Sequence, residues 1–133
     1  MDYLSPADLI AIHELLIMQF GGMRGITEAG FGRLEAAAAA PLASMFGEEI
    51  HATLVEKAAA LCQAIVRAHP FSDGNKRVAL VALDIFLTNN GAALTADDQA
   101  AYAMIMALAR GEAGRDDLEA WIREHSAQGF SFE

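Results

Sequence analysis

The residues of this chain that could do chemistry are concentrated in one stretch, residues 69–77, which reads HPFSDGNKR. It brings together an imidazole, a carboxylate, an amide, an ammonium and a guanidinium group. A histidine titrates near neutral pH and can accept a proton from an attacking hydroxyl. An aspartate suits Mg²⁺, a hard cation that prefers oxygen ligands. The stretch therefore predicts either a site for a phosphate-bearing ligand or a very polar turn.

The stretch interrupts a helical pattern, and the interruption itself favours anion binding. Pro70 ends one helix close to His69, and a second helix is expected to begin close to Asn75. The first backbone N–H groups of a helix have no partner within the helix, and its dipole is positive there. Lys76 and Arg77 lie in that first turn, where cations are unfavourable unless an anion is bound. Phosphate is the natural candidate.

Three other residues of the stretch have predicted roles in the loop. Gly74 removes a side chain where a ligand could approach the backbone. Asn75 can cap the second helix or bond a phosphate, and the sequence favours neither. Phe71 is expected to point inward and anchor the loop. Since the chain has neither a Walker-type phosphate loop nor a zinc spacing of Cys and His, residue chemistry alone supports a nucleotide site and a polar structural turn equally.

The elements that must position this stretch are predicted to be helices of a single all-α domain. A length of 133 residues favours one domain, and a composition rich in alanine with three prolines favours helices. We expect the helical domain to cover residues 1–127 and a C-terminal tail to cover residues 128–133.

Helix start and stop signals divide the part of the chain before the stretch. Residues 5–8 combine a cap residue, a proline and an acid, and two glycines after Phe20 end that helix. Its apolar face is expected to include Phe20. A loop is predicted over residues 21–32, a short helix over residues 34–40, and a long amphipathic helix over residues 47–69 that includes Ile50 in its apolar stripe.

The helix after the stretch is predicted to be the buried centre of the domain, because residues 78–87 are apolar on every side except at Asp84. Two further helices are expected to start at residues 95–98 and 116–119. Cys62 is interpreted as a small core residue, and no internal disulfide is possible with one cysteine. His13 is interpreted as a hydrogen-bonded histidine at the margin of the core rather than a catalytic one.

Charge and hydropathy exclude several classes of partner. A net charge of −9 argues against general binding to nucleic acid and against attraction to anionic membranes. Against this background, three of the nine basic residues, Arg67, Lys76 and Arg77, lie close together. No secretory signal is visible at the N-terminus, and the apolar runs are shorter than the about 20 residues that span a bilayer. We expect a soluble cytoplasmic protein.

The sequence HPFSDGNKR resembles the signature of the Fic/Doc superfamily, H-x-F-x-[DE]-G-N-[GK]-R. Further segments, residues 4–13, 20–22, 34–41 and 86–91, are similar to the death-on-curing (Doc) toxin branch. The resemblance implies an all-helical bundle in which the motif forms the loop between two central helices. This architecture agrees with the one expected from the helix signals.

The resemblance also implies an activity. Doc-like proteins are toxins of type II toxin–antitoxin systems, kinases that transfer the γ-phosphate of ATP to a threonine of elongation factor Tu and so inhibit translation. By this resemblance ATP and Mg²⁺ are the expected cofactors, and transfer depends on positioning and charge neutralisation. The implied catalytic residues are a general base (His69), a magnesium-linked carboxylate (Asp73) and two cations (Lys76 and Arg77), and the implied nucleotide-binding residues are Gly74, Asn75, Lys76 and Arg77.

Two positions bear on the type of group transfer. Adenylylating relatives typically continue the motif as G-N-G-R-x-x-R, whereas this chain has Lys76 in place of the second glycine and Leu80 in place of the final arginine. Both differences favour phosphoryl transfer over AMP transfer. Adenylyl or other nucleotidyl transfer is the alternative enzymatic reading, and a catalytically silent partner in a toxin–antitoxin repressor complex is the non-enzymatic one. Val78 and Ala40 stand where many relatives carry threonine and arginine.

The resemblance finally implies two protein partners. One is elongation factor Tu as the substrate. The other is a cognate antitoxin whose disordered C-terminal segment folds as a helix in a groove of the toxin. Direct contact with nucleic acid or membrane is not expected.

Overall fold

The computed structural model describes residues 1–128 and confirms the all-α class. Over these residues the chain forms six α-helices: α1 (Pro6–Phe20), α2 (Gly30–Ala39), α3 (Leu54–Ala68), α4 (Asn75–Asn89), α5 (Asp98–Ala109) and α6 (Arg115–Glu124). The remaining elements are short: a 3₁₀ turn, η1 (Ala40–Leu42), and the strands β1 (Ser44–Met45), β2 (Glu48–Glu49), β3 (Ala92–Leu94) and β4 (Ser126–Gln128). The strands form two antiparallel pairs, β1 with β2 and β3 with β4.

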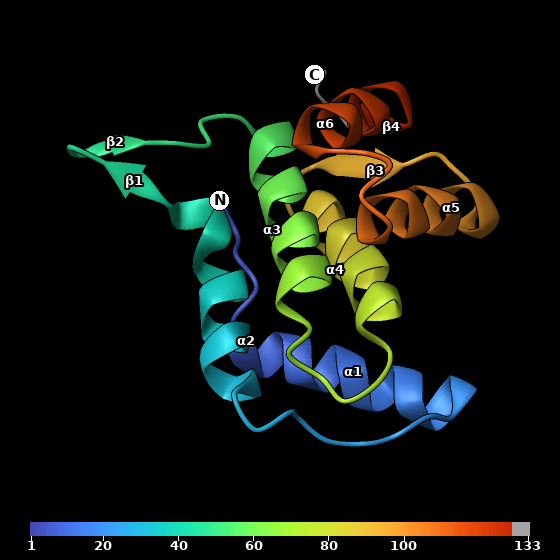
Figure 1. The fold of residues 1–133 in the computed structure, drawn as a ribbon. Coiled ribbons are helices and arrows are strands. Elements are labelled where there is room, and N and C mark those ends of the chain that lie inside the picture. Colours follow the sequence, from blue (N-terminus) through green and yellow to red (C-terminus); the bar gives the residue numbers. More distant parts are fainter. Residues whose placement is uncertain (129–133) are drawn as a thin grey trace.

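Helices α3 and α4 form the centre of the bundle and run side by side in opposite directions (Figure 1). The loop that joins them contains the chemistry-bearing stretch, and α1 crosses the bundle at that end. The core is built from the facing apolar residues of these helices, among them Leu61 and Ile65 of α3 and Leu83 and Phe86 of α4. The burial of one side of α4 confirms that this helix is central, while Asp84 is exposed.

The start of α1 forms as the sequence predicts. The Ser5 hydroxyl accepts a hydrogen bond from the Asp8 N–H (3.1 Å), and the Asp8 carboxylate accepts one from the Ser5 N–H (2.8 Å). This capping box satisfies backbone groups that a helix start leaves without partners. Gly21, with φ 80°, ends the helix after Phe20.

The prediction that a helix begins at residue 47 is wrong, because α3 begins at Leu54. Thr53 caps α3: its hydroxyl accepts from the Glu56 N–H (3.2 Å), and the Glu56 carboxylate accepts from the Thr53 N–H (2.9 Å). This capping box fixes the helix start more strongly than the apolar spacing before it. Ile50, predicted on the buried stripe, is 48% exposed.

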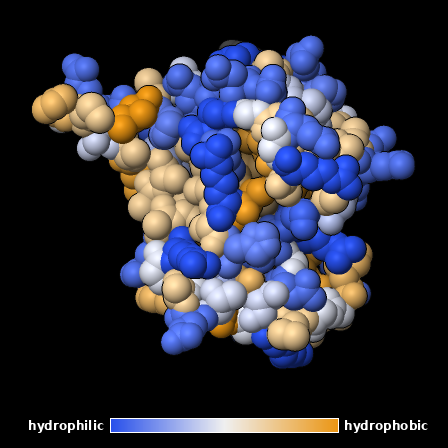
Figure 2. Space-filling model, in the orientation of Figure 1, coloured by the Kyte–Doolittle hydropathy of each residue, from blue (hydrophilic) through white to orange (hydrophobic). Residues whose placement is uncertain are grey.

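The segment before α3 is a β-hairpin. Phe46 (φ 53°) and Gly47 (φ 82°) form its turn, and two consecutive positive φ angles are typical of tight hairpin turns. The buried Lys57 ammonium ties the hairpin to the bundle by donating to the Glu49 carboxylate (2.8 Å) and to the Pro41 carbonyl (3.2 Å). The hairpin projects from the end of the bundle opposite the α3–α4 loop, and Phe46 at its turn is 98% exposed (Figures 1 and 2).

Helix α2 also differs from the prediction, since it begins at Gly30 rather than at residue 34. The sequence assigns Gly30 to a loop because glycine is a poor helix former. In the structure Gly30 is buried, and a Cβ at this position would overlap Ile26 Cγ2 and the Pro70 carbonyl oxygen. Close packing of α2 against the α3–α4 loop therefore requires glycine here.

The C-terminal end of the described chain differs from the predicted tail. Gln128, assigned above to the tail, pairs with Ala92 in the sheet of β3 and β4, and the other predicted tail residues, 129–133, lie outside the described residues. Over residues 1–128, no helix has both the length and the apolar character that crossing a bilayer requires.

Two glycines of α2 provide a matched test of this packing. Gly30→Ala should lower the free energy of unfolding by about 1–3 kcal/mol, because the added methyl group overpacks a filled contact. Gly32→Ala, at a position with no atom within 4 Å of the added carbon, should raise it by about 0.5 kcal/mol through helix propensity. Urea unfolding of both variants measures the difference, and equal effects at the two positions would contradict the packing role.

Candidate active site

The α3–α4 loop begins at His69, which ends α3 in the left-handed conformation (φ 51°, ψ 54°). Its imidazole is exposed, and Nδ1 lies 3.2 Å from the Val66 carbonyl oxygen. Because a carbonyl oxygen can only accept, Nδ1 must carry the proton in this hydrogen bond. Nε2 of the neutral ring is then the unprotonated nitrogen, which is the state a general base requires.

The loop is closed by the side chain of Asn75. Its amide oxygen accepts from the Phe71 N–H (3.0 Å), and its amide nitrogen donates to the Phe71 carbonyl (2.9 Å). Asn75 is 5% exposed, and Gly74 rather than Asn75 occupies the cap position of α4. The capping interpretation of Asn75 is therefore wrong, and its role as a phosphate ligand stays a prediction. Burial of Phe71 confirms that this ring anchors the loop.

The segment that follows α1 lies along the same loop (Figure 1). The Ser72 N–H donates to the Gly25 carbonyl (3.0 Å), the Thr27 N–H donates to the Pro70 carbonyl (3.0 Å), and Ile26 pairs with Phe71 in an isolated antiparallel bridge. Sequence reasoning missed this contact. The glycines in this segment predict a loop, but they do not indicate which part of the chain the loop contacts.

Asp73 is exposed, yet all three of its oxygen atoms accept hydrogen bonds. Oδ1 accepts from the Gly74 N–H (2.9 Å) and Oδ2 from the Met23 N–H (3.1 Å). Its backbone carbonyl lies 2.9 Å from Nε2 of His13. The His13 imidazole is buried, and this bond confirms a hydrogen-bonded histidine at the core margin.

The Asp73 carboxylate fits the magnesium role that the sequence predicts. Mg²⁺ is usually held by one or two carboxylates together with phosphate oxygens and water. A carboxylate fixed at both oxygens presents such a ligand in one orientation. Over residues 1–128, no group of three or more His, Cys, Asp and Glu residues gathers into a metal site.

Lys76 and Arg77 lie in the first turn of α4, as predicted. The Arg77 guanidinium carbon lies 4.5 Å from the centre of the Phe20 ring. Phe20, predicted in the core, is 56% exposed because it covers this cation instead. Neither Lys76 nor Arg77 forms an ion pair with a carboxylate of residues 1–128. Two such cations at a helix N-terminus, where the dipole is already positive, favour a bound anion.

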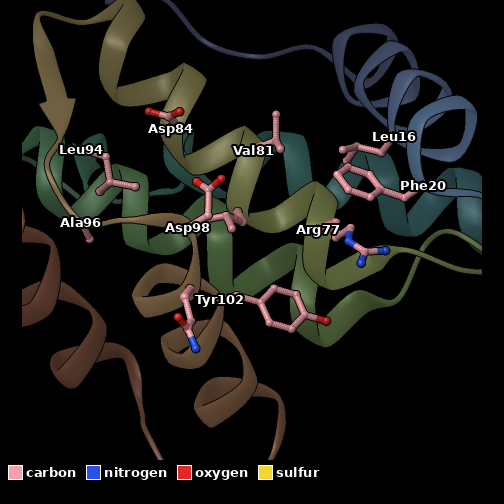
Figure 3. Close-up of a pocket in the computed structure, with 11 residues that line it drawn as sticks. Leu16, Phe20, Arg77, Val81, Asp84, Leu94, Ala96, Asp98 and Tyr102 are labelled. Carbon is pink, nitrogen blue, oxygen red and sulfur yellow. The ribbon is translucent and has the colours of Figure 1, made fainter.

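A groove of about 520 Å³ adjoins Arg77 between α1, α4 and α5. Figure 3 shows Arg77 beside Phe20 at one end and the carboxylates of Asp84 and Asp98 toward the other. Although the Asp84 side chain is exposed, partial desolvation in the groove and the nearby charge of Asp98 raise the pKa of its carboxyl. The sequence did not indicate this groove, whose apolar lining comes from three helices and includes Leu16, Leu80, Val81 and Tyr102.

Comparison with known proteins gives the family. The model of the Fic/DOC family matches residues 3–87. The chain is 38% identical over 96 residues to Toxin Doc of Mycolicibacterium smegmatis, an alignment that covers 72% of this chain and 70% of the relative. It is 40% identical over 91 residues to Protein kinase doc of Escherichia phage P1, with coverage of 68% and 70%. The chain therefore belongs to the Fic/Doc family and to its Doc toxin branch, as the motif predicted.

Two glycines with similar backbone angles test the placement of the Asp73 carboxylate. A Cβ at Gly22 (φ 119°) would lie 2.8 Å from Asp73 Oδ2, whereas a Cβ at Gly25 (φ 103°) has no atom within 4 Å. Both alanine variants carry backbone strain. Only Gly22→Ala should displace the carboxylate and weaken binding of Mn²⁺, used as a paramagnetic substitute for Mg²⁺, by about tenfold. Equal affinities in the two variants, measured by electron paramagnetic resonance, would contradict this placement.

Proposed function

We propose that this protein is a Doc-type toxin that acts as a protein kinase, transferring the γ-phosphate of ATP to a threonine of elongation factor Tu and so inhibiting translation. The observation that carries the proposal is the composition of one loop. It holds a histidine whose Nδ1 bonds a backbone carbonyl, so that Nε2 of the neutral ring can accept a proton, together with an oriented carboxylate and two cations that pair with no carboxylate of residues 1–128. The name of the phage relative, Protein kinase doc, supports the same activity.

The residues of the loop have distinct tasks in this reaction. Nε2 of His69 accepts the proton of the threonine hydroxyl as its oxygen forms a bond to the γ-phosphorus, while the bond from that phosphorus to the bridging oxygen breaks and releases ADP. Lys76, Arg77 and the backbone N–H groups at the start of α4 stabilise the phosphate charge. Asp73 would hold Mg²⁺, and the ion would supply positive charge that neutralises the phosphates.

Two residues beside the proposed phosphate site, Lys76 and Leu80, support phosphoryl transfer rather than nucleotidyl transfer. Leu80 lies one turn after Arg77 and lines the apolar groove, so it adds no cation to the anion site. Lys76 adds an ammonium group where nucleotidyl-transferring relatives have glycine. These two residues favour transfer of the terminal phosphate. Because elongation factor Tu acts on ribosomes, the proposal includes a cytoplasmic location.

Transfer from ATP labelled separately at the α and γ phosphates tests the activity. With Mg²⁺ and elongation factor Tu, the γ label should be transferred, and His69→Ala should slow transfer by about 100-fold or more because the base is lost. His51→Ala, which removes an imidazole beyond the opposite end of α3, should keep the rate. Transfer of the α label would establish nucleotidyl transfer. No transfer, together with full toxicity of His69→Ala in cells, would establish a non-enzymatic role.

We further propose that the groove between α1, α4 and α5 receives a helix of the cognate antitoxin. Its apolar floor suits the apolar face of an amphipathic helix. Its ends carry opposite charges, with Arg77 at one end and Asp84 and Asp98 toward the other (Figure 3). The occupant would therefore present an acidic residue to Arg77 and a basic residue to the two carboxylates. An acidic residue at Arg77 would compete with the phosphates for this cation, which accounts for inhibition.

A pair of helical peptides tests the charge match at the carboxylate end. A peptide with an apolar stripe and a terminal lysine should bind about tenfold more tightly than the same peptide with glutamine at that position. Asp84→Asn should remove most of this difference, whereas Asp116→Asn on α6 should keep it. Since partial desolvation raises the pKa of Asp84, the lysine peptide should lose affinity as pH falls through that pKa and Asp84 becomes neutral. Calorimetry gives the affinities, and a pH-independent preference in both variants would reject this charge match.

A further inference from the structure

We propose that His13 is a positioning residue: its imidazole fixes the main chain at Asp73 and thereby orients the carboxylate of that residue. The magnesium role of Asp73 belongs to the proposed function, and this inference rests on it only for its consequence. The positioning itself is a property of the folded chain. It can be measured without nucleotide, metal or protein substrate.

The hydrogen bond and the ring stacking of His13 both lie at the α3–α4 loop. The ring is 4% exposed, and its Nε2 lies 2.9 Å from the Asp73 carbonyl oxygen. Its face stacks on the Phe71 ring with centroids 4.0 Å apart and planes 7° apart. A Cβ at Gly74 would lie 3.9 Å from His13 Cδ2, so the ring edge lies directly beneath the turn into α4. One side chain of α1 thus contacts two residues of the motif, Phe71 and Asp73, and lies close to a third, Gly74.

The hydrogen bond also fixes the tautomer of His13. The Asp73 carbonyl oxygen can only accept, so Nε2 must carry the proton and donate it. His69 has the opposite arrangement, with the proton on Nδ1. The two histidines therefore have different tasks, one holding the loop and the other presenting an unprotonated nitrogen.

Space filling alone does not require a histidine at this position. Ile10 and Ile17, from the same helix, border the cavity beside the ring, and an apolar side chain there would avoid the cost of burying an imidazole. What an apolar side chain lacks is the donor to Asp73. The carbonyl and the carboxylate of Asp73 belong to one residue, so fixing the main chain fixes the point from which the carboxylate reaches the Met23 and Gly74 N–H groups.

Two substitutions separate the hydrogen bond from the packing. His13→Phe keeps an aromatic ring against Phe71 and removes the donor. His13→Gln removes the ring and keeps a donor. If His13 acts only in packing, the glutamine variant should be the more disturbed at Asp73. If His13 acts through the donor, the phenylalanine variant should be the more disturbed at Asp73.

The direct readout is the backbone amide of Met23, which donates to Asp73 Oδ2. In nuclear magnetic resonance spectra of the protein without ligands, His13→Phe should shift the Met23 amide proton upfield by several tenths of a ppm, as expected when its hydrogen bond lengthens. His13→Gln should leave it close to its original position. The original protein should also show the nitrogen shifts of an Nε2-protonated His13. An unchanged Met23 amide in His13→Phe, or an Nδ1-protonated ring, would overturn the proposal.

The consequence for metal binding is a second readout. His13→Phe should weaken Mn²⁺ binding about tenfold even if its midpoint of thermal unfolding rises, and His13→Gln should stay within threefold of the original affinity even if that midpoint falls. Affinities that follow thermal stability instead would support a packing role. If the original protein transfers no phosphate, the proposed function fails, while the Met23 amide still decides whether His13 positions Asp73.

Discussion

The side chain of Asn75 bonds both backbone groups of Phe71, and the site depends on this pair of hydrogen bonds. A chain that reverses direction between two packed helices leaves backbone groups without helical partners, and burying them unpaired is costly. Asn75 satisfies two of them from inside the first turn of α4. The same contact closes the loop between His69 at the end of α3 and the cations at the start of α4.

Around this closed loop, the first helix and the segment after it supply the outer contacts. His13 bonds the backbone of Asp73, Met23 bonds its carboxylate, and Gly25 bonds Ser72. Phe20 covers the Arg77 guanidinium from the same side. The N-terminal quarter of the chain therefore supports the loop of residues 69–77, to which we assign the chemistry. The chain is acidic, yet it has two adjacent cations at a helix start, where an anion would stabilise them.

Two helix signals with a local cause were predicted correctly, whereas another local signal and one that depends on a distant partner were missed. The capping box at Ser5 and the turn into α4 follow from residues next to each other, and both lie where expected. Ile50 matched the spacing of a helix that does not include it, because the cap at Thr53 and the turn at Phe46 and Gly47 were stronger local constraints. Gly30 was assigned to a loop because its close contacts with Ile26 and with Pro70, forty residues away, are visible only in the folded chain.

The sequence by itself determined the family and the all-α class, and it singled out the stretch proposed to carry the chemistry, because these depend on residue types at fixed spacing. Only the tertiary structure decided which ring nitrogen of His69 and of His13 bonds a backbone carbonyl, what Asn75 bonds, and that Phe20 lies over Arg77 rather than in the core. The groove with opposite charges at its ends also required three helices to be packed before it existed. Each of these features depends on which distant residues folding brings within hydrogen-bonding or packing distance, and a linear pattern does not contain that information.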